Sequence, residues 1–155
     1  MKVITLTQPW ATLVAIGAKK IETRSWNTTY RGPLAIHAAV GKYVDDYLLM
    51  KVEPFYSALR NAGIESRLQI PLGGIIATCE LVHVKQMDEL QVFPACRGIG
   101  YKQQYWKLDA KERAFGHYEV GRYMWLLSNV KKLDKPIAAK GALGLWNFDM
   151  PTLED

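Results

Sequence analysis

The sequence predicts an α+β domain: a small, strongly bent β-sheet that closes toward a barrel, with helices at its side. Two long strand-like runs, residues 75–85 and 123–133, carry this prediction. Short runs at 3–6 and 145–148 add a strand near each end, and few segments have helical spacing. The run at 75–85 is apolar at its start and alternating at its end, as in a strand that crosses a curved sheet.

The chain is long enough for one domain with a hydrophobic core and too short for two, since it has 155 residues. We assign residues 1–150 to a single domain and 151–155 to an acidic tail. No apolar run reaches the roughly 20 residues that span a bilayer, and the first apolar run is too short for a secretory signal. We therefore expect a cytoplasmic protein without membrane contact.

The remaining segments alternate between short helices, strands and one long loop. Residues 9–18 have helical spacing, with Thr7 as a candidate N-cap and Gly17 as the residue that ends the helix. Further elements are expected as helices at 44–50 and 54–61, as strands at 20–26 and 34–39, and as a long functional loop with one helical turn at 94–120.

The stretch from Gly17 to Trp26 concentrates charge in ten residues. Read as a turn followed by a strand, it leaves Lys19 at the turn and alternates its later side chains between two faces. One face then carries Lys20, Glu22, Arg24 and Trp26. Two interpretations stay open: a surface that receives a flat, polar, anionic partner, or an edge strand whose charges deter aggregation.

A second concentration of positive charge lies at 91–140, where ten Lys and Arg residues face four Asp and Glu, a local net charge of +6 against +5 for the whole chain. The same region carries the rings of Tyr101, Tyr105, Trp106, Phe115, Tyr118, Tyr123 and Trp125. Basic residues interleaved with aromatic rings are typical of single-stranded nucleic-acid binding, since cations hold phosphates and rings stack on bases. The alternative is that half of these rings belong to the core and that the lysines only aid solubility.

Neither the cysteines nor the histidines form a metal site by spacing. Cys79 and Cys96 are not paired like zinc ligands, and Cys79 lies in an apolar run typical of a buried side chain. His37 stands alone in an apolar strand, which favours a core histidine over one in a cleft. Because phosphate-binding and dinucleotide-binding glycine loops are also missing, we expect no metal and no cofactor.

Three motifs together resemble the ASCH domain family. They are LTQPWA at 6–11, G-x-K-x-x-E-x-R at 17–24 and YRGPLAI at 30–36. The resemblance implies a β-barrel of the PUA-like superfamily with flanking helices and a cleft lined by Lys19, Glu22 and Arg24. It also implies RNA or another nucleic acid as the ligand, with a nucleotide or nucleoside as a further possibility.

Other candidate site residues follow from their position. Gly17 would form the tight turn that brings the backbone close to a ligand. The weaker candidates are Gln8, Trp10, Trp26, Arg31 and Lys140.

The function that we expect is RNA binding, and one alternative is a small hydrolase. A lysine beside a carboxylate can recognise a base edge and a phosphate, or it can act as a base or nucleophile when burial lowers its pKa. As an enzyme, the protein would use Lys19 with Glu22 on RNA or on acetylated cytidine. Some family members that act on acetylcytidine carry threonine where this chain has Glu22. A protein–protein adaptor, the third hypothesis, would need a large apolar patch.

Overall fold

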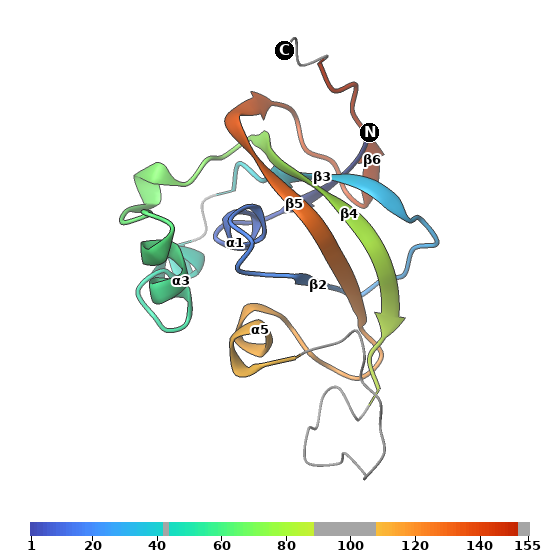
Figure 1. The fold of residues 1–155 in the computed structure, drawn as a ribbon, viewed down its shortest axis with the longest axis horizontal. Helices are drawn as coiled ribbons and strands as arrows, with labels where there is room; N and C mark the ends of the chain where they lie inside the picture. Colours follow the sequence, from blue (N-terminus) through green and yellow to red (C-terminus); the bar gives the residue numbers. More distant parts are fainter. Residues whose placement is uncertain (42–43, 89–107, 152–155) are drawn as a thin grey trace.

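The computed structural model describes residues 1–41, 44–88 and 108–151. Its elements along the chain are β1 (Lys2–Leu6), α1 (Trp10–Ala15), β2 (Ile21–Arg24), β3 (Gly32–Ala38), α2 (Val44–Leu49), α3 (Phe55–Asn61), the 3-10 turn η1 (Arg67–Gln69), β4 (Gly74–Gln86), α5 (Ala110–Phe115), β5 (Tyr123–Ala138) and β6 (Leu145–Asn147) (Figure 1).

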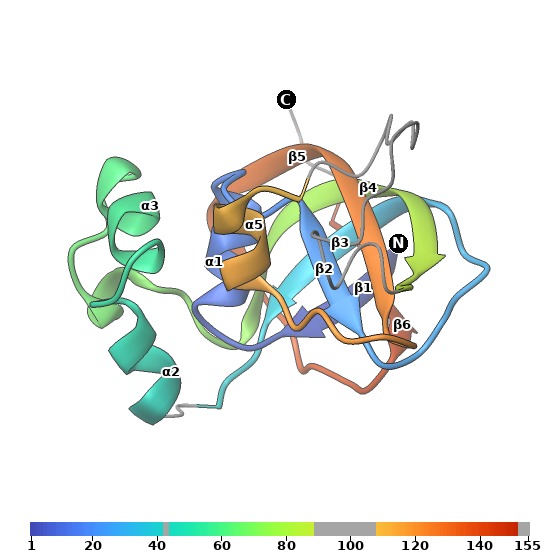
Figure 2. The same ribbon diagram turned by 90° about the horizontal axis from the view of Figure 1, so that it is seen from below.

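The six described strands form one mixed sheet in the order β2-β5-β4-β3-β1-β6, in which only β1 and β3 run parallel. The two long strands β4 and β5 pair along most of their length, with three register shifts between them. Such irregularities bend a sheet and increase its twist. The sheet curls into a half-barrel with the helices to one side (Figure 2). The predicted α+β class with a bent sheet is therefore confirmed.

Helix α1 lies in the hollow of this curved sheet (Figure 1). Its buried Ala11 and Val14 belong to the same core cluster as Leu34, Ile36 and Trp125, which come from β3 and β5. Burying such side chains stabilises the fold by roughly 1.5–3 kcal/mol for each large one. The helix therefore fixes the position of the turn and the strand β2 that follow it.

A second core cluster joins α1 to α3 and α5. Phe55 of α3 packs edge-to-face against Phe115 of α5, with ring centroids 5.0 Å apart, and against Trp10 of α1 at 6.4 Å. Leu13 and Leu59 are buried in the same cluster. These contacts bring three segments that are distant in sequence to one side of β2.

Two local predictions differ from the structure. The side chain of Thr7 does not cap α1; instead Oε1 of Gln8 accepts a hydrogen bond of 3.0 Å from the backbone N–H of Thr12. Residues 110–115, predicted as part of a loop with one helical turn, form helix α5, whose first turn is capped by the carboxylate of Asp109 at 2.8 Å. The predicted loop before residue 108 and Cys96 lie outside the described residues.

Several single-residue predictions can be compared with the structure. His37 is buried, and its Nε2 lies 2.9 Å from the carbonyl oxygen of Ala139, which confirms the core-histidine interpretation. Cys79 is a free, buried thiol, and burial, with a smaller effect of Glu80, raises its pKa to about 12. Within the described ranges, no helix is both long and apolar enough to cross a bilayer, and no group of three His, Cys, Asp or Glu could hold a metal ion.

Candidate functional site

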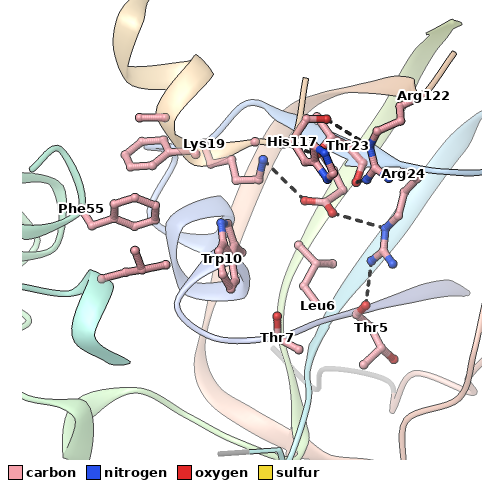
Figure 3. A pocket seen from close by; sticks show the side chains of 15 residues that line it. Thr5, Leu6, Thr7, Trp10, Lys19, Thr23, Arg24, Phe55, His117 and Arg122 are labelled. Carbon is pink, nitrogen blue, oxygen red and sulfur yellow. Dashed lines mark hydrogen bonds and ion pairs between the residues drawn. The ribbon is translucent and has the colours of Figure 1, made fainter. Parts of the chain in front are cut away.

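A pocket of about 370 Å³ lies between β1, β2, the helices and the turn after α5 (Figure 3). The end of β1 and Trp10 of α1 form one wall, and β2 with Lys19 forms another. Leu49 of α2 and Phe55 of α3 close the apolar end, while residues 114–117 and Arg122 complete the rim. This size falls within the range of small-ligand and nucleotide pockets.

The end of helix α1 aims Lys19 into this pocket. Gly17 has a φ of +78°, a backbone conformation that glycine adopts without steric cost. The N–H groups of Gly17 and Ala18 bond the carbonyl oxygens of Val14 and Leu13, respectively, the pattern of a Schellman cap. Lys19 N–H also bonds Leu13, at 3.0 Å. The turn therefore ends the helix and leads directly into β2, which begins at Ile21.

Three side chains from this turn and β2 form a row of ion pairs. Nζ of Lys19 lies 3.6 Å from Oε2 of Glu22, and Nε of Arg24 lies 3.3 Å from Oε1 of the same carboxylate. The second contact is an ion pair without hydrogen-bond geometry, because Nε of Arg24 makes no hydrogen bond. Lys19 is only 1% exposed and also donates to the carbonyl oxygen of Ile21. Glu22 therefore stands between a buried cation and a cation at the pocket surface.

The far end of Arg24 is tied to another strand. Its Nη2 donates a hydrogen bond of 2.8 Å to the carbonyl oxygen of Thr5 in β1. The guanidinium therefore spans the pocket floor from Glu22 to Thr5, as Figure 3 shows.

A buried carboxylate from α5 holds the start of β2. Glu112 is 5% exposed and accepts hydrogen bonds from the N–H groups of Lys20 and Ile21 at 2.9–3.2 Å. Burial raises its pKa above the ordinary value of 4.5, although these hydrogen bonds and the charge of Lys19 act in the opposite direction. Glu112 is not part of the pocket lining. It fixes the backbone of the two residues that lie between Lys19 and Glu22, which do line the pocket.

The opposite rim is built by the turn after α5. The backbone N–H of His117 donates to Oγ1 of Thr23 at 2.9 Å, and Nε of Arg122 donates to the carbonyl oxygen of His117 at 3.1 Å. The His117 ring is largely exposed and lies 3.0 Å from Glu119. These contacts attach the turn to β2, the strand that carries Glu22 and Arg24.

The lining combines a net positive charge with flat apolar surfaces. Among the described lining residues, the cations Lys19, Arg24 and Arg122 are accompanied by one carboxylate, Glu22. Trp10 and Phe55 supply rings, and Leu6 and Leu49 add aliphatic surface. Such a lining suits a ligand that has an anionic group, a hydrogen-bonding edge and a planar face.

The structure brings together only part of the predicted set. Lys19, Glu22, Arg24 and Trp10 all line the pocket, and Gly17 forms the turn beside it. The other predicted residues do not line it. Gln8 is buried and hydrogen-bonds to Pro71 and Thr12, and Trp26 packs edge-to-face on Trp125, with ring centroids 4.7 Å apart. Arg31 donates hydrogen bonds to carbonyl oxygens of its own loop. Lys140 is exposed and lies outside the pocket.

Sequence reasoning missed Thr23, Phe55, Glu112, His117 and Arg122. Thr23 lies in β2 itself, whereas Glu112, His117 and Arg122 make hydrogen bonds to this strand across 91 to 99 positions, so spacing offered no signal for these three. One signal was available: Asp109 and Glu112 have the spacing of a helix N-cap and its first turn.

The basic region at 91–140 is only partly described. Within the described part, Phe115 and Trp125 are buried in the core, as the alternative interpretation expected for half of the rings. Lys131, Lys132 and Lys135 line a different hollow, at the far end of β5. Residues 91–107 lie outside the described residues.

Comparison with known proteins points to one family. The family model for the ASCH domain matches residues 4–137. Activating signal cointegrator 1 from Mus musculus is 32% identical over 88 residues, which are 57% of this chain and 15% of that protein. The Homo sapiens protein of the same name is 33% identical over 92 residues, 59% of this chain and 16% of its own. The matched region therefore spans about a sixth of these relatives.

A solved structure of a mutant ASCH protein from Zymomonas mobilis aligns with a TM-score of 0.47 and 16% identity, covering 88% of this chain and 74% of that one. The ASCH family, which the three sequence motifs predict, is the family of the matching model and is in agreement with the two relatives.

Proposed function

Because this chain belongs to the ASCH domain family, we propose that it binds RNA in the pocket formed by β2, α1 and the turn after α5. The observation that carries the proposal is the row of ion pairs from Lys19 through Glu22 to Arg24 along a pocket with aromatic walls. The motif G-x-K-x-x-E-x-R supplies that row.

Each part of the lining has a role in this proposal. Arg24 presents at the pocket surface a guanidinium that would also donate an N–H to a phosphate oxygen, beside its contacts with Glu22 and Thr5. The carboxylate of Glu22 accepts hydrogen bonds from amino groups on a base edge. The half-buried ring of Trp10 offers a flat surface against which a base or ribose packs, a contact worth about 1–3 kcal/mol for a stacked base.

Lys19 has a supporting role in the same proposal. Its ammonium is 1% exposed and is already held by the Ile21 carbonyl and Glu22. It therefore orients the Glu22 carboxylate instead of contacting the RNA first. The same contacts disfavour Lys19 as a base or nucleophile, since its side chain is buried and already engaged by the Ile21 carbonyl and by Glu22.

The test is RNA affinity measured by fluorescence anisotropy with a single-stranded oligonucleotide. Arg24→Ala should weaken binding about 10-fold at low salt, because one phosphate contact is lost. The matched control is Lys20→Ala, which removes an exposed cation four residues away that does not line the pocket. Its affinity should stay within about two-fold of the wild type. Equal RNA affinities of the two variants would contradict the proposal that RNA binds in the pocket.

A further inference from the structure

A second hollow, of about 700 Å³, lies on the helical side of the molecule between α2, α3 and the segment that leads to η1. Helices α2 and α3 stand together at the side of the sheet (Figures 1 and 2). The hollow is lined by Lys51, Arg60 and Arg67, by the rings of Tyr47 and Tyr56, and by Glu65 as the one carboxylate of the described lining. We call this surface the α2–α3 groove.

Both arginines of the α2–α3 groove lie over tyrosine rings, within the distance of a cation–π contact. The guanidinium carbon of Arg60 lies 5.5 Å from the centroid of Tyr56, and that of Arg67 lies 5.8 Å from the centroid of Tyr47. A cation–π contact restrains a guanidinium, and a guanidinium carries five N–H donors, more than such a contact uses. Glu65 is 3.6 Å from Arg60 but largely exposed, so this ion pair is readily exchanged for a ligand phosphate.

We propose that the α2–α3 groove is a second contact site for single-stranded RNA, and this inference rests on the proposed function of the pocket. Arg60, Arg67 and Lys51 would hold backbone phosphates, while a base would stack on the exposed Tyr56 ring, on the face opposite Arg60. Cations interleaved with rings on a concave surface are the recurrent composition of such sites, because every base has a face to stack.

The two sites share a wall. Leu49 and Phe55 line the pocket, whereas their neighbours Leu48, Met50 and Tyr56 line the α2–α3 groove. An RNA strand that leaves the pocket across these helices therefore reaches the groove. Binding to both sites needs a strand of several nucleotides, so the groove should matter for long oligonucleotides and not for short ones.

The experiment compares oligouridylates of 4 and 14 nucleotides. Arg60→Gln/Arg67→Gln should weaken binding of the 14-mer about 10-fold and lower its salt slope by about 1.4, as expected for two lost phosphate contacts on a single strand. Tyr56→Ala should weaken the 14-mer without changing that slope. Neither variant should alter the affinity for the 4-mer.

The matched control is Lys20→Gln/Lys111→Gln, which removes the same charge from exposed lysines beside α5. If the control weakens the 14-mer as much as the arginine variant does, or if the 4-mer is weakened equally, the groove is not a separate site. If Arg24→Ala still reduces affinity in that case, the proposed function stands and only this inference is overturned. If the wild type binds neither oligonucleotide, both are overturned.

Discussion

The guanidinium of Arg24 donates a hydrogen bond of 2.8 Å to the carbonyl oxygen of Thr5. The two residues lie on β2 and β1, which are separated by β5, β4 and β3 in the sheet order. The contact therefore crosses the open side of the half-barrel. The cation that we assign to phosphate recognition is also a brace between the first and the fifth strands of the sheet.

Replacing Arg24 should therefore affect stability as well as RNA binding. We expect Arg24→Ala to lower the free energy of unfolding by about 1–3 kcal/mol, because the hydrogen bond to Thr5 and the ion pair with Glu22 are both lost. Arg24→Lys retains the charge, but its single ammonium cannot contact both Glu22 and Thr5. Its free energy of unfolding should therefore lie closer to that of Arg24→Ala than to that of the wild type. Urea denaturation measures both values. An unchanged stability of Arg24→Ala would contradict the brace.

Because Lys19 and Glu22 form a buried pair, we expect the loss of stability to differ according to which of the two is replaced. Glu22→Ala leaves a 1% exposed ammonium without its carboxylate, which should cost about 3–5 kcal/mol. Lys19→Met should cost much less, because Glu22 keeps its contact with Arg24 and the new side chain fills a similar volume.

The double variant Lys19→Met/Glu22→Ala is the control for this asymmetry. It should be more stable than Glu22→Ala alone, since the uncompensated charge is gone. Urea denaturation of the three variants decides the matter, and equal losses for the two single variants would show that burial of Lys19 does not set the cost.

Glu112 predicts a pH dependence of stability. Its pKa is raised in the folded state by burial, so the folded protein binds this proton more tightly than the unfolded chain does. The contribution of Glu112 is fully present below the unfolded pKa of about 4.5 and is lost as the pH rises through the higher folded value. Glu112→Gln cannot ionise and should lack this component.

The measurement is a series of urea denaturations between about pH 4 and 8 for the wild type and Glu112→Gln. The stability of the wild type relative to the variant should fall as the pH increases. A relative stability that rises with pH would mean that the hydrogen bonds from Lys20 and Ile21 outweigh the burial of the carboxylate.

The local part of the site could be predicted from the sequence. Glycine at 17 and the alternation after it indicate a turn and a strand, and the structure indeed buries Ile21 and Thr23 while Glu22 and Arg24 stay half-buried. The long strands and the bent sheet followed from the same kind of short-range pattern. The spacing of apolar residues therefore predicts an element when its buried and exposed side chains alternate within one segment of the chain.

The nonlocal part could not be predicted. Glu112 meets Lys20 across 92 positions, and His117 meets Thr23 across 94. Both contacts depend on how α5 packs against α3 through Phe115 and Phe55, which no spacing rule encodes. Trp26 and Arg31 show the converse: they stand near the motif in sequence, but one packs on Trp125 and the other on its own loop.

We expect substitutions at Gly17 to lower the stability of the protein through the backbone conformation alone. A Cβ at this position would meet no atom within 4 Å, but the φ of +78° disfavours any L residue with a side chain. Gly17→Ala should therefore lower stability by about 1–2 kcal/mol and Gly17→Asn by less, since asparagine tolerates this region. Thermal denaturation measures both. Equal losses for alanine and asparagine would point to a steric cause instead.

At Gly116, on the pocket rim, we expect substitutions to lower stability through steric overlap and not through backbone conformation. Its φ of −126° suits any residue, but a Cβ would lie 2.6 Å from Cε2 of Tyr118 and 3.0 Å from Cγ2 of Thr23. Gly116→Ala must push the turn that carries His117 away from β2, which should cost about 1–3 kcal/mol. Removing the ring should relieve most of this strain, so Gly116→Ala should cost clearly less in a Tyr118→Ala background than in the wild type. Denaturation of the four proteins in this cycle gives the coupling energy, and strictly additive losses would show that the Tyr118 ring is not what confines position 116.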